Sequence, residues 1–145
     1  NVWNLFNNQL VKWGIIMIEI FTMIYITIMG AIMGSFLGCM GYRIPNKIKT
    51  TYPSSFCNDC GKPLKWYMNI PIISYIALCG KCAYCKKPIN FIYPFVEIAC
   101  ALLFLCNYLT FGFNMNFFIS TIITFYCIWY IMIIYFFFTF INLKS

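Results

Sequence analysis

Two long runs of uncharged, mostly apolar residues constrain this chain more than any other feature. The first extends from Ile20 to Tyr42 and the second from Ile98 to Leu143. A helix needs about 20 apolar residues to cross the roughly 30 Å of hydrocarbon in a bilayer. Hydrophobic residues make up 63% of the chain and charged residues only 9%, which is unlike a soluble domain. The sequence therefore predicts an all-α membrane protein.

The second run is too long for one span, and a turn-rich stretch at residues 110–116 divides it. This stretch, Thr-Phe-Gly-Phe-Asn-Met-Asn, has the glycine and asparagines typical of a tight turn. We predict three transmembrane helices, at 20–42, 91–109 and 117–143. They are joined by a loop at 43–90, which we call the cysteine loop, and by an external turn at 110–116. Residues 1–19 form an N-terminal extracytoplasmic segment.

Basic residues set the predicted orientation of these helices. Eight of the ten Lys and Arg residues lie in the cysteine loop, where Asp59 is the only acid. Short loops rich in Lys and Arg stay in the cytoplasm, so we predict a cytoplasmic loop and an N-terminus outside. The net charge of +7 then reflects topology and contact with membrane lipid, and we expect no nucleic-acid partner.

The cysteine loop contains two copies of one pattern, Cys-Asn-Asp-Cys-Gly-Lys-Pro-Leu at 57–64 and Cys-Ala-Tyr-Cys-Lys-Lys-Pro-Ile at 82–89. We call them the first and second knuckles. Two Cys-x-x-Cys turns complete a tetrahedral Zn²⁺ site, and the chain has no histidine. The predicted ligands are Cys57, Cys60, Cys82 and Cys85. Four sulfurs leave no open position for a substrate, so this zinc-ribbon-like site is predicted to be structural.

Three features of the loop have alternative interpretations. Cys79 begins an overlapping Cys-x-x-Cys, but only the Cys82/Cys85 register repeats the Lys-Pro-aliphatic ending of the first knuckle. The apolar segment at 70–78 either forms a small local core, which we favour, or dips into the membrane interface. Glu97, an acid at the start of the second span, either orients the loop against that span or pairs with nearby lysines.

Several motifs in one order resemble the N-terminal region of type IV prepilin peptidases, the peptidase A24 family. The matching positions are Gly34, Ser35, Phe36, Arg43, Pro45, Asn69, Pro71, Ser74, Tyr93, Pro94 and Glu97, together with the four cysteines. The resemblance implies a polytopic aspartic peptidase of the bacterial inner (plasma) membrane that cuts leader peptides from prepilins or pseudopilins. Many members also methylate the new N-terminus, so the resemblance alone implies S-adenosylmethionine as a cofactor.

The chain also departs from the family pattern. Gly38 stands where the family usually has Asn, and Ile92 where it usually has Arg, which puts polar contacts of the methylating region in doubt. Asn142 occupies the expected position of the first catalytic aspartate, and the second would lie beyond Ser145. Because Asn cannot ionise, it cannot activate water in a carboxylate dyad.

These observations leave three functions open. The first is the N-terminal part of a prepilin peptidase, inactive alone; the absent initiator Met and the abrupt end indicate an incomplete reading frame. The second is a noncatalytic relative retained in pilus assembly, which Asn142 favours. The third is an unrelated zinc-ribbon membrane adaptor. A downstream Gly-x-Gly-Asp motif on a later span would favour the enzyme.

Overall fold

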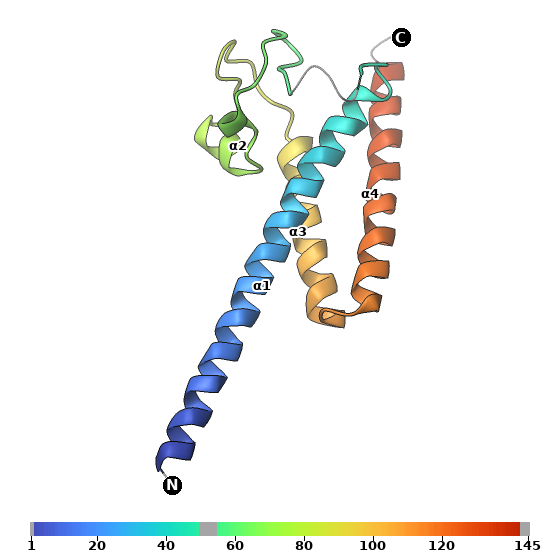
Figure 1. Cartoon of the computed structure of the whole chain (residues 1–145). Helices are drawn as coiled ribbons and strands as arrows, with labels where there is room; N and C mark the ends of the chain where they lie inside the picture. The colour runs from blue at the N-terminus through green and yellow to red at the C-terminus, as the bar shows by residue number, and fades with distance from the viewer. Residues whose placement is uncertain (1, 50–54, 143–145) are drawn as a thin grey trace.

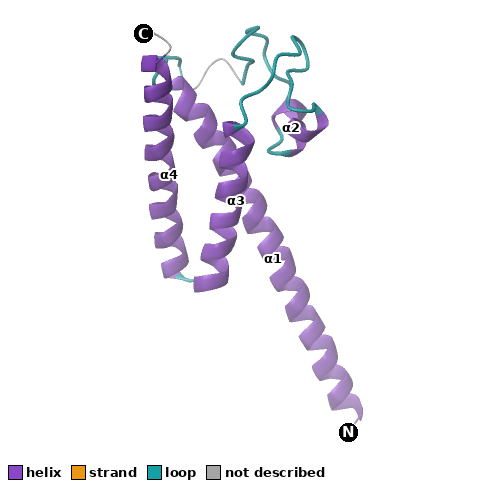
Figure 2. Ribbon diagram, turned by 180° about the vertical axis from the view of Figure 1, so that it is seen from behind, coloured by secondary structure: helices purple, strands orange, loops and turns teal. Residues whose placement is uncertain are grey.

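The computed structural model describes residues 2–49 and 55–142, and these residues form helices and loops without a strand. In chain order the elements are α1 (Val2–Arg43), the short 3₁₀ helix η1 (Trp66–Asn69), α2 (Ile73–Ala77), α3 (Ile92–Phe111) and α4 (Met115–Asn142). The long helix α1 leans across α3, and α3 and α4 form an antiparallel hairpin (Figures 1 and 2). The cysteine loop lies beside the end of the bundle where α1 ends and α3 begins.

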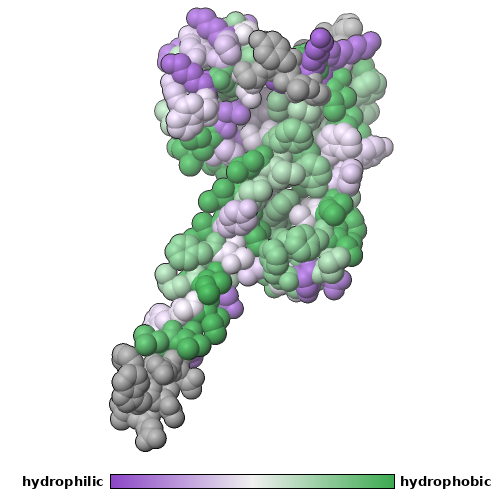
Figure 3. Space-filling model, in the orientation of Figure 1, coloured by the Kyte–Doolittle hydropathy of each residue, from purple (hydrophilic) through white to green (hydrophobic). Residues whose placement is uncertain are grey.

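Three of these helices are long and apolar enough to cross a membrane. They are Gln9–Arg43 within α1, the whole of α3, and Met115–Thr139 within α4. Figure 3 shows hydrophobic surface along the bundle and hydrophilic surface concentrated on the cysteine loop. The three-helix fold, with a cysteine cluster between its first and second spans, is confirmed, and the chain is a multi-pass membrane protein.

Helix α1 is longer than the predicted first span. We placed the start of the span at Ile20 because Glu19 and Lys12 are charged, but the helix runs without a break from Val2. No proline interrupts it, and a Cβ added at Gly14 would meet nothing within 4 Å. The predicted external location of residues 1–19 stays a prediction, and residue 1 lies outside the described residues.

A tight turn joins α3 to α4, at the place indicated by the glycine and asparagines. Gly112 ends α3 with a φ of +64°, a conformation that glycine adopts without steric cost. Asn114 then caps α4, because its Oδ1 accepts the backbone N–H of Phe117 at 3.1 Å. Further into the membrane, the side chain of Asn107 on α3 bonds Ser120 and Thr124 on α4 at 2.9 and 3.3 Å. These polar contacts hold the hairpin closed.

Helices α1 and α3 approach so closely that their backbones touch. A Cβ added to Gly34 would lie 2.8 Å from the Cα of Glu97, and one added to Gly30 would lie 2.8 Å from the carbonyl oxygen of Cys100. Small residues permit this approach, which maximises van der Waals contact in lipid. The contact places the first turns of α3 beside the last turns of α1, where the candidate site is found.

The local core that we favoured for the segment at 70–78 is only partly formed: Ile70, Ile72, Tyr75 and Leu78 are half-buried. No residue of α2 is buried, and Ile73 and Ile76 are 63% and 69% exposed. The helix is a single turn that rests on η1, and one turn cannot enclose its own apolar side chains.

Candidate metal centre and adjoining pocket

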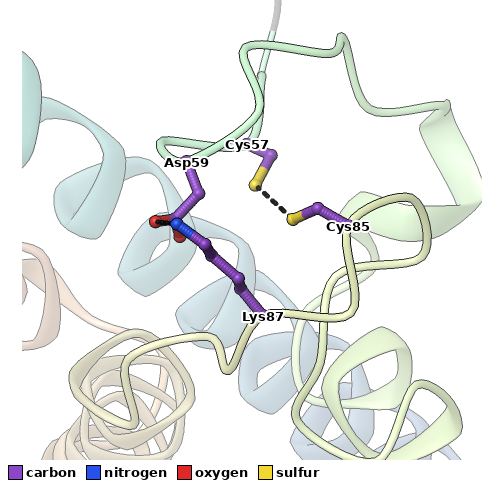
Figure 4. Close-up of polar contacts among 4 residues, drawn as sticks. All are labelled: Cys57, Asp59, Cys85 and Lys87. Carbon is purple, nitrogen blue, oxygen red and sulfur yellow. Dashed lines mark hydrogen bonds and ion pairs between the residues drawn. The ribbon is translucent and has the colours of Figure 1, made fainter.

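The four predicted ligands come together where the two knuckles meet. The sulfur atoms of Cys57, Cys60, Cys82 and Cys85 all lie within 4.8 Å of one another, and Cys79 is not among them. Cys57 Sγ and Cys85 Sγ face each other across 3.8 Å (Figure 4). Zn–S bonds of about 2.3 Å in a tetrahedron place sulfurs roughly 3.8 Å apart. The cluster can therefore hold a metal ion, and its size and soft donors fit zinc.

The two knuckles share one backbone structure. The N–H of Gly61 donates to the carbonyl of Cys57 at 2.9 Å, and the N–H of Lys86 donates to the carbonyl of Cys82 at 3.1 Å. Gly61 and Lys86 hold the same position in the repeat, and both are left-handed, with φ of +67° and +59°. Glycine adopts this conformation freely, whereas lysine does so at a cost. The sequence repeat is thus a structural repeat, with one strained copy.

The thiols of the second knuckle differ in their readiness to ionise. The backbone N–H of Cys85 lowers the pKa of Cys82 to about 7. The backbone N–H of Lys87 also lowers the pKa of Cys85, but burial and the neighbouring thiols outweigh it and raise that pKa to about 11. One thiolate forms readily, whereas several thiolates this close need a cation to offset their repulsion. The cluster therefore suits a divalent metal ion.

An exposed ion pair also joins the two knuckles. Lys87 Nζ lies 3.0 Å from Asp59 Oδ1 (Figure 4), and the carboxylate raises the pKa of Lys87. Both side chains are largely in solvent, so the pair adds little to stability.

Two hydrogen bonds between residues far apart in the sequence tie the cysteine loop to α3. Asn58, inside the first knuckle, donates its Nδ2 to the hydroxyl of Tyr93 at 3.2 Å. Glu97 is buried and accepts the backbone N–H of Ile72 at 2.7 Å, and Ser35 contacts the same carboxylate. Ile72 has a φ of +62°, which is strained for a β-branched residue, and the hydrogen bond to the carboxylate stabilises this costly conformation. This contact corresponds to the orienting role considered for Glu97.

A pocket of about 460 Å³ lies between the cysteine loop and the ends of the long helices. Helices α1, α3 and α4, both knuckles and α2 all contribute to its walls. The family-type positions that line it are Ser35, Arg43, Asn69, Ser74, Tyr93, Pro94 and Glu97. Its volume suits a small molecule or the end of a peptide. Motifs far apart in the sequence thus meet at one concave site.

A family model described as the bacterial peptidase A24 N-terminal domain matches residues 28–111, more than half of the chain. The chain belongs to this family. The prepilin leader peptidase/N-methyltransferase of Myxococcus xanthus is 38% identical over 89 residues, covering 61% of this chain and 27% of the relative. The proteins of the same name from Pseudomonas putida and Klebsiella pneumoniae are 33% and 34% identical. They match 53% and 59% of this chain and 34% and 40% of their own lengths.

The chain thus spans about a third of the length of these A24 relatives. The matched region contains the last turns of α1, the whole cysteine loop and α3. No solved structure matches the chain. The resemblance deduced from the motifs is confirmed, and the A24 match includes every residue of the pocket lining except Phe136 and Thr139 of α4.

Other A24-type positions lie outside the pocket lining. Gly34 is in the α1–α3 contact, and Phe36 is 52% exposed on the outer side of α1. Pro45 follows the end of α1, and Pro71 precedes α2. Asn142 is the last residue of α4, and its side chain lies outside the described residues.

Sequence analysis missed several residues of the site because their roles depend on tertiary contacts. Asn58 had a weak signal, as a polar residue inside a knuckle, but its partner Tyr93 is distant in sequence. Asn46 lines the pocket and donates its Nδ2 to the carbonyl of Tyr42 at 2.8 Å. A Cβ on Gly38 would lie 3.1 Å from Cδ1 of Tyr93, so the ring occupies space that the usual A24 asparagine would need.

Proposed function

We propose that this chain is the N-terminal, metal-bearing part of an aspartic prepilin peptidase of the bacterial inner membrane. The observation that carries the proposal is the convergence of A24 motif positions from α1, α3 and the cysteine loop on one pocket. The relatives named above are prepilin leader peptidases/N-methyltransferases, and the match to them covers this region. The substrates of the intact protein are prepilins or pseudopilins, whose apolar helices lie along the bundle while the leader approaches the loop.

Zn²⁺ is the metal of this proposal, and its role is structural. Four cysteine sulfurs at tetrahedral spacing support zinc, and they leave no coordination position for water. The ion joins the two knuckles, and the first knuckle in turn reaches α3 through Asn58. Metal binding therefore positions one wall of the pocket.

In the proposed methylating activity, this pocket binds S-adenosylmethionine. Its sulfonium is a cation, and a buried carboxylate beside an aromatic ring is suited to hold a cation. Glu97 and Tyr93 provide these groups in the pocket lining. Gly38 and Ile92 replace polar residues usual in the family, so we expect weaker binding than in a complete relative.

Photo-crosslinking of radiolabelled S-adenosylmethionine to the full chain in detergent tests this assignment. Glu97→Gln removes the charge but keeps an oxygen for the N–H of Ile72, and we expect labelling to fall at least fivefold. Glu19→Gln, outside the pocket lining, is the matched control and should not change it. S-adenosylhomocysteine should compete. Equal labelling of both variants would contradict the assignment.

Cleavage of a prepilin is not expected from this chain alone. An aspartic peptidase needs two neighbouring carboxylates to activate water. Among the acids present, Glu97 is bonded to Ile72 and Asp59 to Lys87. Asn142, at the expected aspartate position, favours a second candidate, a noncatalytic relative that acts in pilus assembly.

A chimera distinguishes these two candidates. The later spans of a related A24 peptidase, which supply the second aspartate, are fused after residue 145. With Asn142 kept, we expect no cleavage of a prepilin; with Asn142→Asp, cleavage should rise by several orders of magnitude. Cleavage with Asn142 intact would show that the catalytic position is misassigned. Failure of both chimeras, when a parent enzyme cleaves in the same assay, would favour the noncatalytic relative.

In the proposed membrane orientation, the cysteine loop lies in the cytoplasm. Impermeant thiol labelling of intact cells should reach a cysteine introduced by Asn114→Cys, at the α3–α4 turn, and miss one introduced by Lys49→Cys. The unsubstituted chain is the control for its native cysteines. The reverse pattern would overturn the cytoplasmic assignment and place the knuckles in an oxidising compartment, where their cysteines could instead form disulfides.

A further inference from the structure

Exposed apolar residues of α2 lie close to exposed aromatic residues at the start of α3. Ile73 and Ile76 lie three residues apart, and so on one side of the single turn. Tyr75 packs against Phe91 with ring centroids 6.3 Å apart, and Phe91 is 6.4 Å from Phe95 on the next turn of α3. Phe91 and Phe95 are 61% and 54% exposed. We call Ile73, Ile76, Phe91 and Phe95 the α2 patch.

The α2 patch lies at the level of the membrane-spanning part of α3. Ile72, which directly precedes α2, is bonded to Glu97, five residues after Ile92 begins α3. At 1.5 Å per residue, this is about 7.5 Å along the helix axis. The 20 residues of α3 are just enough to cross roughly 30 Å of hydrocarbon, so its first residue lies at the hydrocarbon edge. Figure 1 shows α2 beside the first turns of α3, below the knuckles.

The residues around the α2 patch are those favoured at a membrane interface. Helix η1 contacts α2 and carries Trp66 and Tyr67, which are 80% and 45% exposed. Aromatic rings of this kind concentrate at headgroup level. Lys65 precedes η1 and Lys81 follows α2, and both side chains are exposed. Lysines close to a membrane surface are attracted to anionic lipid headgroups. In Figure 3 the loop is hydrophilic above and hydrophobic along its lower edge.

We propose that the α2 patch docks into the interface of the bilayer leaflet that surrounds the start of α3. Its isoleucines and phenylalanines lie at the acyl boundary, and the lysines lie among anionic headgroups. Lipid is the occupant because the patch continues onto the apolar, outward-facing side of a helix that already spans the bilayer. The cysteine loop is therefore held by the membrane surface as well as by its bonds to α3.

Fluorescence quenching by brominated lipid tests this proposal in the full chain, reconstituted in bilayers that contain anionic lipid. The four native tryptophans are replaced by Phe, and Ile76→Trp introduces the only probe. Tyr84→Trp in the second knuckle is the matched control, because Tyr84 lies in the loop but outside the α2 patch. With bromines close to the headgroup, we expect quenching at 76 to be at least threefold stronger than at 84.

Two further measurements keep the result interpretable. Metal content shows whether a substitution has unfolded the loop, and so does an Ile73→Trp probe. In a folded chain, tryptophans at 73 and 76 should be quenched alike. Equal quenching at 76 and 84 in metal-loaded protein would overturn the proposal. So would quenching at 76 that falls as the protein-to-lipid ratio rises, because that would indicate a second protein on the patch.

Discussion

The helical bundle and the cysteine loop are two regions of one chain that are stabilised in different ways. In the bundle, Gly30 and Gly34 bring the backbones of α1 and α3 into contact, and Leu37, Cys100 and Met132 belong to a buried apolar core. Within residues 55–90 of the loop, Cys82 is the only buried residue. A segment this size without a core needs another source of stability, and the sulfur cluster is where a metal ion would supply it. The comparison predicts that the bundle and the loop unfold independently of each other.

Loss of a ligand should have the largest effect, and only on the loop. Structural zinc contributes about 10 to 16 kcal/mol of apparent binding free energy in small domains. Cys57→Ser should therefore leave the loop unfolded while the helices still insert. Limited proteolysis should cut between residues 55 and 90 in the variant and not in the parent. Cys79→Ser, outside the cluster, is the control, and equal cleavage of both variants would contradict the comparison.

A glycine substitution should have the converse effect on the bundle. Gly34→Leu places side-chain atoms where Glu97 Cα and the carbonyl of Val96 already lie 2.8 Å from a Cβ. Such overpacking costs about 1 to 3 kcal/mol or more, because the two backbones must separate. Unfolding in mixed detergent micelles should detect the loss, and Gly14→Leu should show none, since that position is open. Retention of zinc by both variants would confirm that the regions are independent.

The hydrogen bond between Glu97 and Ile72 couples the bundle to the cysteine loop. Loss of this bond should have an intermediate effect on stability. Glu97→Ala leaves the N–H of Ile72 without its acceptor, which costs about 1 to 3 kcal/mol. Amide hydrogen exchange at Ile72 should accelerate by one to two orders of magnitude, as this free energy implies. Exchange along α4 should not change, and Glu19→Ala should leave Ile72 protected. Unchanged protection in Glu97→Ala would remove the proposed link between regions.

The strained position of the second knuckle should give the smallest effect. Lys86→Gly relieves a φ of +59° and should stabilise the loop by about 0.5 to 1 kcal/mol, offset in part by the greater freedom of the unfolded chain. Gly61→Ala at the equivalent position should destabilise the first knuckle. The rate of metal loss to a chelator, compared with the parent, measures both. Opposite shifts support the structural repeat, and shifts of the same sign would contradict it.

Local patterns predicted the parts of this molecule that depend on local chemistry. Hydropathy predicted the three spans, and glycine conformation predicted the turn at Gly112. Ligand spacing predicted which four cysteines come together. The beginning of α1 was not predicted, because isolated charges mark a hydropathy boundary without ending a helix.

Tertiary contacts account for what the sequence did not predict. The partners Asn58 and Tyr93 are separated by 35 residues, and no local pattern pairs them. The segment at 70–78 was taken for a core because its residues are apolar, yet the tether of Ile72 to Glu97 leaves Ile73 and Ile76 exposed beside α3. Apolar residues beside a membrane helix can be buried in lipid instead of in a protein core. A rule derived from soluble domains does not include this possibility.

The central claim is that one metal ion, held by four sulfurs, replaces a core in the cysteine loop. X-ray absorption at the zinc edge of the full chain, purified with one metal ion per molecule, tests it most directly. The account predicts four sulfur neighbours at about 2.3 Å and no nitrogen or oxygen in the first coordination sphere. A mixed shell with oxygen neighbours, or a protease-resistant loop in protein that contains no metal, would contradict it.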